Sequence, residues 1–410
     1  MLLWLGLRIL QQNHQKLNPI CQFEAFERQP GMISVLAGKP NASVFPLTSF
    51  QFSAKSPFDQ DKEDAFRVIG EKLTQALQYG PTHGILSLIE WMDGSFMKDG
   101  DLRLGVGRRT FYLKASSAVI QPGDYALIEP PAYALKANII HTDNDGTKST
   151  NLREILENWP ESRPFPKILY TVPYRGNPFG ATTSEERRRD ILALARKYNF
   201  LIFEDDPYFY YYYGDSLCLA LYFALEHELP EVGSVARFDS LSEIISGGFR
   251  IGFACGPEVN IDVVNVHTSI SNLQASTFTQ VIADTFLCSW GHEGFKKHAE
   301  HVAEFYRRIK LLLDNPSTSH TLRGAHDNPE GNSDCILSYA ITEGVLPLPG
   351  ISFMPDVKET PYVRVPFSQI EEDKIKEAVV RLAKAGESNA LVLDFTIESI
   401  EVEILMLLIG

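Results

Sequence analysis

The sequence predicts an α/β fold with a mainly parallel central sheet and helices on both of its faces. Between residues 80 and 255, five short apolar stretches alternate with segments of helical periodicity. Strands buried on both faces are almost continuously apolar, and parallel strands need a crossover, usually a helix, between them. Ligands of such sheets bind at the carboxyl ends of the strands. We therefore expect the functional residues in the turns that follow the apolar stretches.

The composition is that of a globular protein and excludes several classes of partner. Of the 410 residues, 44% are hydrophobic and 22% are charged, and the net charge is −14. An excess of negative charge disfavours nucleic acid and anionic membrane surfaces as partners. The five cysteines are scattered, without a CxxC pair. This pattern argues against a disulfide framework or a metal site and for a reducing, cytoplasmic location.

The two ends of the chain are apolar, but neither predicts a membrane span. Polar residues follow the first ten at once, and a basic start is lacking, so we expect a packing arm and not a signal peptide. Acidic residues such as Asp394 and Glu401 interrupt residues 390–410. No stretch reaches the roughly 20 apolar residues that a span requires.

The first third of the chain predicts an arm, a helix and a turn with phosphate-binding character. Residues 31–46 contain many turn formers and predict an irregular arm. Apolar residues at helical spacing predict a helix over residues 60–78, which ends at Tyr79 before Gly-Pro. Residues 103–121 predict a turn feeding a helix whose start contains Gly107, Arg108 and Arg109. Backbone N–H groups at a helix start favour a phosphate.

Three apolar segments in the middle of the chain predict strands: residues 125–129, 167–172 and 200–203. Each leads into a turn that carries polar or aromatic candidates, namely Tyr133, Asn177, and Asp205 with Tyr208. Thr183-Ser184-Glu185-Glu186 offers a capping box, which predicts the start of a helix. These turns lie where the α/β pattern places a ligand site.

Residues 234–253 predict a strand, a polar turn and a second strand. Ser240, Ser242 and Arg250 could converge on a phosphate, because hydroxyls and a guanidinium are natural partners for that dianion. A serine-rich turn with an unrelated arginine is the alternative. Further on, residues 265–312 predict a loop and then helices, 314–335 a loop or hinge, 362–368 a strand and 370–385 a helix.

The segment 234–253 resembles the cofactor loop of the fold-type I pyridoxal-phosphate enzymes of the class I/II aminotransferase family. That family has Ser-x-Ser-Lys with an arginine seven residues after the lysine. Ser240, Ser242 and Arg250 match, and Glu243 stands at the position of the Schiff-base lysine. The resemblance covers about residues 31–386 and is nearest to aminoadipate/kynurenine-type enzymes and related enzymes of fungal secondary metabolism.

The resemblance implies roles for the candidates around a bound pyridoxal or pyridoxamine phosphate. Asp205 would keep the pyridine nitrogen protonated, Asn177 and Tyr208 would contact the ring hydroxyl, and Tyr133 would stack on the ring. The turn Gly107-Arg108-Arg109 takes the place of the family's phosphate turn. Gly38, Asn177 and Arg364 would contact the substrate, with Arg364 on its α-carboxylate.

The resemblance also implies a domain plan and an assembly. We expect an N-terminal arm (1–50), a large cofactor-binding domain (51–300) and a small α+β domain (301–410) that is truncated relative to the family. A homodimer is expected, in which Tyr79 reaches the cofactor phosphate of the partner subunit.

Glu243 leaves three possibilities for the chemistry, because a carboxylate cannot form the Schiff base. The protein could act as a transaminase on an amino acid or a derived metabolite in biosynthesis, with non-covalent cofactor and Glu243 as base. The site could serve another reaction, of lyase, dehydratase or cyclase type. The chain could also be an inactive homologue. Glu243→Lys is expected to restore covalent attachment of pyridoxal phosphate.

Overall fold

The computed structural model describes residues 31, 38–96, 101–129, 138–140, 142–143, 145–176, 180–211, 220–313, 333–349, 352, 363–365, 370–387, 393–394 and 405–409. Two compact units are present, and each is treated by itself. The first consists of Met1–Gly123, Leu201–Tyr210 and Glu226–His301, and the second of Asp124–Phe200, Tyr211–Leu225 and Val302–Gly410. The domain boundaries expected after residues 50 and 300 remain predictions.

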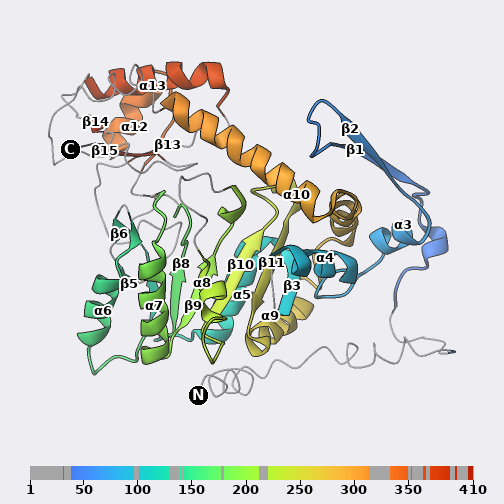
Figure 1. The fold of residues 1–410 in the computed structure, drawn as a ribbon, viewed down its shortest axis with the longest axis horizontal. Helices are drawn as coiled ribbons and strands as arrows, with labels where there is room; N and C mark the ends of the chain where they lie inside the picture. Colours follow the sequence, from blue (N-terminus) through green and yellow to red (C-terminus); the bar gives the residue numbers. More distant parts are fainter. Residues whose placement is uncertain are drawn as a thin grey trace. The chain divides into compact units, whose positions relative to one another are not determined.

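The sheet of the first unit has the strand order β3 (Asp101–Val106), β11 (Ile251–Gly256), β10 (Val235–Ser240) and β9 (Leu201–Asp205) (Figure 1). Strand β9 is parallel to β10, and the other two pairings are antiparallel. Every residue of β9, β10 and β11 is buried, which explains why these segments are so apolar. The strands predicted at residues 200–203 and on both sides of the 241–249 turn are confirmed.

Two helices of the first unit, α5 (Gly107–Val119) and α9 (Glu258–Ser271), pack on these strands and on each other (Figure 1). The start of α5 lies directly on β11: a Cβ atom at Gly252 would come within 2.3 Å of the backbone nitrogen of Arg108. Only glycine permits so close an approach. The β11 backbone therefore sets where the first turn of α5 begins.

The helix predicted over residues 60–78 is wrong in its first half. Strand β1 (Phe50–Lys55) pairs antiparallel with β2 (Glu63–Val68), and the helix α3 covers only Gly70–Leu77. Side chains of β2 alternate between exposed and half-buried, a period of two that the apolar positions also fit. The rings of Phe52 and Phe66 stack across the pair, 5.1 Å apart, and this long-range pairing decides the outcome.

Two further expectations in the first unit are corrected. Residues 103–106 belong to β3 and not to a turn, because they pair along β11. The loop expected at residue 265 is absent, since α9 continues to Ser271 and the break lies between it and α10 (Thr277–Leu313). Helix α10 is kinked at Gly291, whose φ is 63°. Helix α4 covers Leu86–Phe96.

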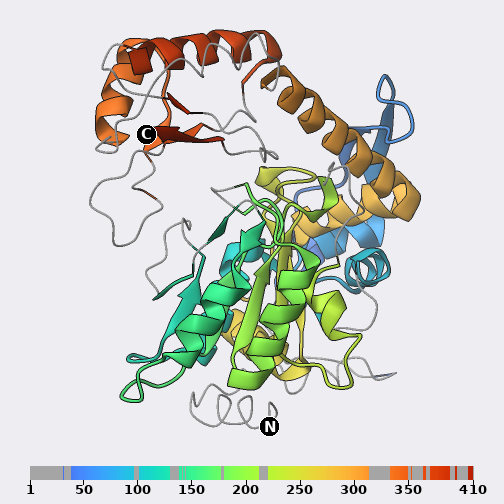
Figure 2. The same cartoon turned by 60° about the vertical axis from the view of Figure 1, so that its left-hand side comes forward.

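In the second unit, the strands β8 (Ile168–Thr171), β4 (Ala126–Ile128) and β5 (Asn138–Ile139) run parallel, as predicted for 125–129 and 167–172. Helices α6 (Ser149–Glu157) and α7 (Glu185–Tyr198) lie side by side, in green in Figure 2. Ser184 caps α7 by accepting a hydrogen bond from the Arg187 N–H, which confirms the predicted helix start.

The C-terminal part of the second unit is an antiparallel sheet with two helices. Its strand order is β12 (Leu348–Pro349), β13 (Val363–Val365), β15 (Leu405–Ile409) and β14 (Leu393–Asp394), and the helices are α12 (Ser333–Thr342) and α13 (Glu372–Glu387). The predicted strand at 362–368 and helix at 370–385 are confirmed over their described residues. The remaining short elements are η2 (Ala42–Val44), β6 (Thr142–Asp143), β7 (Gly146–Thr147), η3 (Phe209–Tyr211), α8 (Tyr222–Glu226) and η4 (Gly247–Phe249).

In the described part of the chain, no helix combines the length and the apolar character needed to cross a membrane.

Candidate functional site

The turn between β10 and β11 brings two serines and an arginine together. The Ser242 N–H donates to the Ser240 Oγ at 2.8 Å. The Arg250 guanidinium donates to the Ser242 Oγ at 3.2 Å and to the Gly247 carbonyl at 3.3 Å. Arg250 has a left-handed backbone, with φ at 52°, which turns the chain back into β11. The convergence on a phosphate that these residues suggest stays a prediction.

The start of α5 lies against the same guanidinium. A Cβ atom at Gly107 would come within 2.6 Å of the Arg250 Nη2, and φ of Gly107 is 69°. The missing side chain therefore lets a cation, together with the hydroxyl that it contacts, lie against the N-terminal turn of a 13-residue helix. Such donors are suited to an oxyanion. We call Gly107, Ser240, Ser242 and Arg250 the phosphate cradle.

Next to the cradle, Arg108 bridges two carboxylates that sequence analysis had assigned to catalysis. Its Nε lies 2.7 Å from the Asp205 Oδ1, and its Nη1 donates to the Glu243 Oε1. The Asp205 side chain is 2% exposed, and those of Glu243 and Arg108 are 17% and 23% exposed. The guanidinium therefore joins the end of β9 to the turn after β10.

The second oxygen of Glu243 remains available for other contacts. Among the described residues, its Oε2 is buried and has no hydrogen-bond partner. A buried acceptor without a donor is costly, so this atom is a candidate for contact with a ligand or a proton.

Arg108 and Arg109 were grouped in the sequence as phosphate-turn residues, and the structure separates them. Arg108 faces Asp205 and Glu243, whereas Arg109 is exposed. Beside them, burial raises the pKa of the Tyr112 phenol, Arg109 and Arg108 oppose this effect and Asp205 adds to it. A phosphate role for either arginine stays a prediction.

A buried charge network contacts the cradle at Ser240. The Arg237 Nη2 lies 2.6 Å from the Asp239 Oδ2 and 3.2 Å from the Asp206 Oδ2, and all three side chains are at most 1% exposed. The Asp239 Oδ1 accepts from the Ser240 N–H at 2.6 Å, so the network fixes the end of β10. Burial would lower the pKa of Arg237, but Tyr210, Asp239 and Asp206 raise it well above its ordinary value.

Asp239 has an unusual pKa in this network. Burial raises it to about 7, the neighbouring Glu243 adds to the rise, and Arg237 and the Ser240 N–H oppose it. Arg237 and Asp239 were not among the residues predicted from the sequence. The available signal was two charged residues at a spacing of two inside an otherwise apolar strand.

The remaining predicted residues are distributed as follows. Tyr208 is buried just after β9, Tyr79 is 57% exposed after α3, and Gly38 is exposed. Arg364 is the central residue of β13, opposite Leu348 in the register. Tyr133 and Asn177 lie outside the described residues, and their roles stay predictions.

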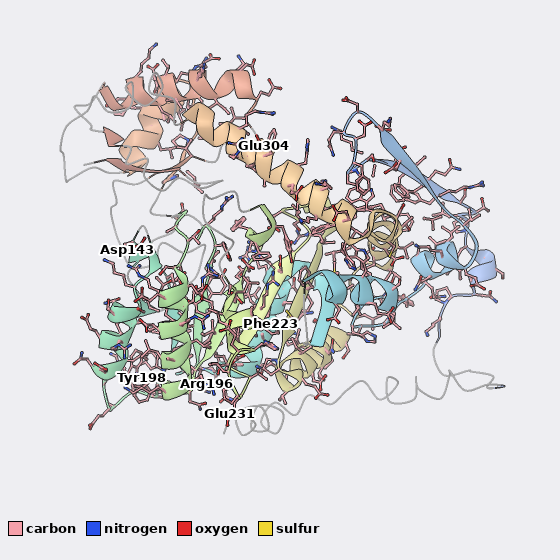
Figure 3. All side chains as sticks on the ribbon, in the orientation of Figure 1. Asp143, Arg196, Tyr198, Phe223, Glu231 and Glu304 are labelled. Carbon is pink, nitrogen blue, oxygen red and sulfur yellow. The ribbon has the colours of Figure 1, made fainter. Side chains whose placement is uncertain are left out.

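Two other charge pairs among the described residues are more exposed than the Arg237 network. In the second unit, Asp143 pairs with Arg187, and on α10 the exposed Glu304 pairs with Arg307 at 2.7 Å; Asp143 and Glu304 are labelled in Figure 3. Exposed pairs contribute little to stability. Within the ranges that the structure covers, no group of His, Cys, Asp and Glu side chains is arranged to hold a metal ion.

Comparisons with known proteins agree on one family. The sequence profile described as "Aminotransferase class I and II" matches residues 72–382. Aminotransferase tdiD of Emericella nidulans is 35% identical over 395 residues, covering 87% of this chain and 90% of that protein. The mitochondrial kynurenine/alpha-aminoadipate aminotransferase of Bos taurus is 31% identical over 411 residues, covering 86% and 91%.

Solved structures show the same fold. Aminotransferase Aro8 from Candida albicans has a TM-score of 0.78 at 19% identity, covering 92% of this chain and 96% of that one. The kynurenine aminotransferase of Pyrococcus horikoshii, solved with PMP, has a TM-score of 0.68 at 28% identity, covering 78% and 84%.

Proposed function

The chain belongs to the class I and class II aminotransferases, and on that basis we propose that it binds pyridoxal or pyridoxamine phosphate and acts on an amino acid or a metabolite derived from one. The family is pyridoxal-phosphate dependent and has the fold of type I. The observation that carries the proposal is the phosphate cradle, which combines a guanidinium, a hydroxyl and a helix start around Gly107.

The residues present fit the phosphate end of the cofactor. A Cβ atom at Gly107 would come within 2.6 Å of the Arg250 Nη2, so glycine lets the guanidinium lie against the start of α5, where both could face an anion. Arg250 and Ser242 already share a hydrogen bond of 3.2 Å and would both turn toward phosphate oxygens. The buried ion pair of Arg237 and Asp239 fixes the position of Ser240, whose N–H donates to Asp239.

The ring end of the cofactor also finds a suitable partner. Asp205 is a nearly buried carboxylate at the carboxyl end of β9 and would pair with the protonated pyridine nitrogen. When bound, the cofactor draws electrons away from the substrate Cα and so makes its proton acidic. Arg108, which now pairs with Asp205, must give up this contact.

Glu243 would move the proton in this scheme. Its buried Oε2 has no hydrogen-bond partner among the described residues and would move the proton between the cofactor C4′ and the substrate Cα. A carboxylate at this position also attracts an amine. The site is therefore suited to the aminated cofactor, pyridoxamine phosphate, held without a covalent bond.

We propose an α-amino acid, or the corresponding 2-oxo acid, with an aromatic or kynurenine-like side chain as substrate. The proposal is supported by the names of relatives that act on kynurenine, alpha-aminoadipate and aromatic amino acids. Arg364 would bind the α-carboxylate. We further propose a cytoplasmic homodimer, in which the exposed Tyr79 extends toward the partner subunit.

The experiment measures binding and a single half-reaction. Calorimetry should show pyridoxamine phosphate bound by the wild type and not by Arg250→Ala. Bound pyridoxamine phosphate and an aromatic 2-oxo acid should yield the amino acid and pyridoxal phosphate, detected by mass spectrometry, and Glu243→Gln should slow this step. Equal binding to wild type and Arg250→Ala would contradict the proposal.

A second candidate is a homologue that binds the cofactor without transaminating. The glutamate at the lysine position favours it. Tight, Arg250-dependent binding of pyridoxamine phosphate, with no amino acid formed from any 2-oxo acid, would support this candidate.

A further inference from the structure

Arg108 contacts the two carboxylates that would face the cofactor, and the inference drawn from this contact rests on the proposed function. We propose that Arg108 is an internal competitor of the cofactor: its guanidinium holds Asp205 and Glu243, the two carboxylates that pyridoxamine phosphate would pair with, and must leave them before the cofactor binds. The juxtaposition that carries this inference is the double contact of one guanidinium with Asp205 and Glu243.

The Arg108 guanidinium excludes a second cation from the Asp205 carboxylate. The Nε of Arg108 lies 2.7 Å from the Asp205 Oδ1, and the Asp205 side chain is 2% exposed. A carboxylate so deeply buried has little space for a second cation beside the guanidinium. A pyridinium nitrogen that pairs with Asp205 must therefore replace the Arg108 Nε.

The negative charges of Asp205 and Glu243 must be balanced both before and after the cofactor binds. Asp205 and Glu243 are both within reach of one cation, and a carboxylate that loses its partner in a buried site is strongly destabilising. Pyridoxamine phosphate carries a pyridinium and an amine, so it can replace both contacts of Arg108. Pyridoxal phosphate carries an aldehyde in place of the amine, which leaves Glu243 without a cation.

The Arg108 side chain can move away without disturbing the cradle. Arg108 is the second residue of α5, its side chain is 23% exposed, and its guanidinium contacts the two carboxylates. The adjoining Gly107 lies against Arg250 through its backbone. Rotation of the Arg108 side chain toward solvent would keep the helix start and Arg250 in place.

Arg108→Ser tests the inference, with Arg109→Ser as the matched control. Arg109 is the adjacent, exposed residue of the same helical turn, so its replacement removes the same charge. Calorimetry on the full chain uses pyridoxamine phosphate, pyridoxal phosphate and inorganic phosphate as probes. Since a hydrogen bond to a charged group contributes the equivalent of tenfold or more in affinity, Arg108→Ser should tighten pyridoxamine phosphate binding by about tenfold or more.

The other expected results define the mechanism. Inorganic phosphate should bind Arg108→Ser and wild type within about threefold, because the cradle is unchanged. Arg109→Ser should not tighten either ligand. Wild type should prefer pyridoxamine phosphate to pyridoxal phosphate, and Arg108→Ser should gain thermal stability from pyridoxamine phosphate more than wild type does. If Arg108→Ser is poorly folded, Arg108→Gln keeps the length without the charge and carries the same expectations.

Three outcomes would overturn the inference, and they are distinguishable. Weaker binding of both pyridoxamine phosphate and inorganic phosphate to Arg108→Ser would make Arg108 a phosphate ligand, while the proposed function stands. Absence of binding to folded wild type and Arg108→Ser alike would refute the proposed function and the inference together. Equal tightening by Arg109→Ser would assign the effect to bulk charge and refute the inference alone.

Discussion

The ion pair between Arg108 and Glu243 should have a measurable coupling energy in the cofactor-free protein. Two unit charges 4 Å apart attract by about 4 kcal/mol at the effective dielectric constant near a protein surface. Desolvation offsets part of this, and hydrogen bonds to charged groups contribute about 1.5–3 kcal/mol net. Because the two side chains are only 23% and 17% exposed, we expect a coupling of about 2 kcal/mol.

The perturbation is a double-mutant cycle of Arg108→Ser and Glu243→Gln. Arg108→Ser should cost more, about 3–5 kcal/mol, because it also leaves the buried Asp205 without this cation. Glu243→Gln should cost about 2 kcal/mol, since Arg108 keeps Asp205. The double variant should then cost about 2 kcal/mol less than the sum of the single variants.

The assay is urea unfolding without cofactor, followed by tryptophan fluorescence and circular dichroism, whose agreement tests two-state behaviour. A parallel cycle with Arg109→Ser and Glu243→Gln is the control, and it should be additive within about 0.5 kcal/mol. Additivity of the Arg108 cycle within the same margin would show that the pair does not hold the site together. The proposal that Arg108 competes with the cofactor for these carboxylates would then fail.

Three other predictions test the site and its supporting charges. Glu243→Lys should attach pyridoxal phosphate covalently, seen as a mass increase after borohydride reduction; an unmodified mass despite tight binding would show that residue 243 does not reach the cofactor. Arg237→Met should destabilise the protein by about 3–5 kcal/mol because it removes the guanidinium that pairs with the buried carboxylates of Asp206 and Asp239, and adding Asp239→Asn should recover part of this loss in urea unfolding; no recovery would argue against the network. Burial lowers the pKa of Lys114 from 10.5 to about 8, so the folded state binds fewer protons than the unfolded state between those values and stability should rise with pH across that window. Lys114→Met should abolish the rise; a wild-type stability that falls from pH 8 to 10 would contradict the assignment.

Local patterns were sufficient for much of the fold. Apolar runs with polar turns predicted β9, β10 and β11, and the capping residues at Ser184 predicted the start of α7. These signals lie within a few neighbouring residues, where backbone preference and burial act together. The helix expected over residues 60–78 failed for the opposite reason, because β2 depends on pairing with β1.

The same division holds for the candidate site. The sequence by itself determined the family, and it predicted the cradle residues and a glutamate in place of the lysine, since these are contained in one segment and its motif. Only the tertiary structure decided that Arg108 is the partner of Glu243, 135 residues away, and that Arg237 also pairs with Asp206. Charges separated along the chain have no local signature of pairing. Their contact follows from the way in which β11 and the start of α5 approach each other at Gly252.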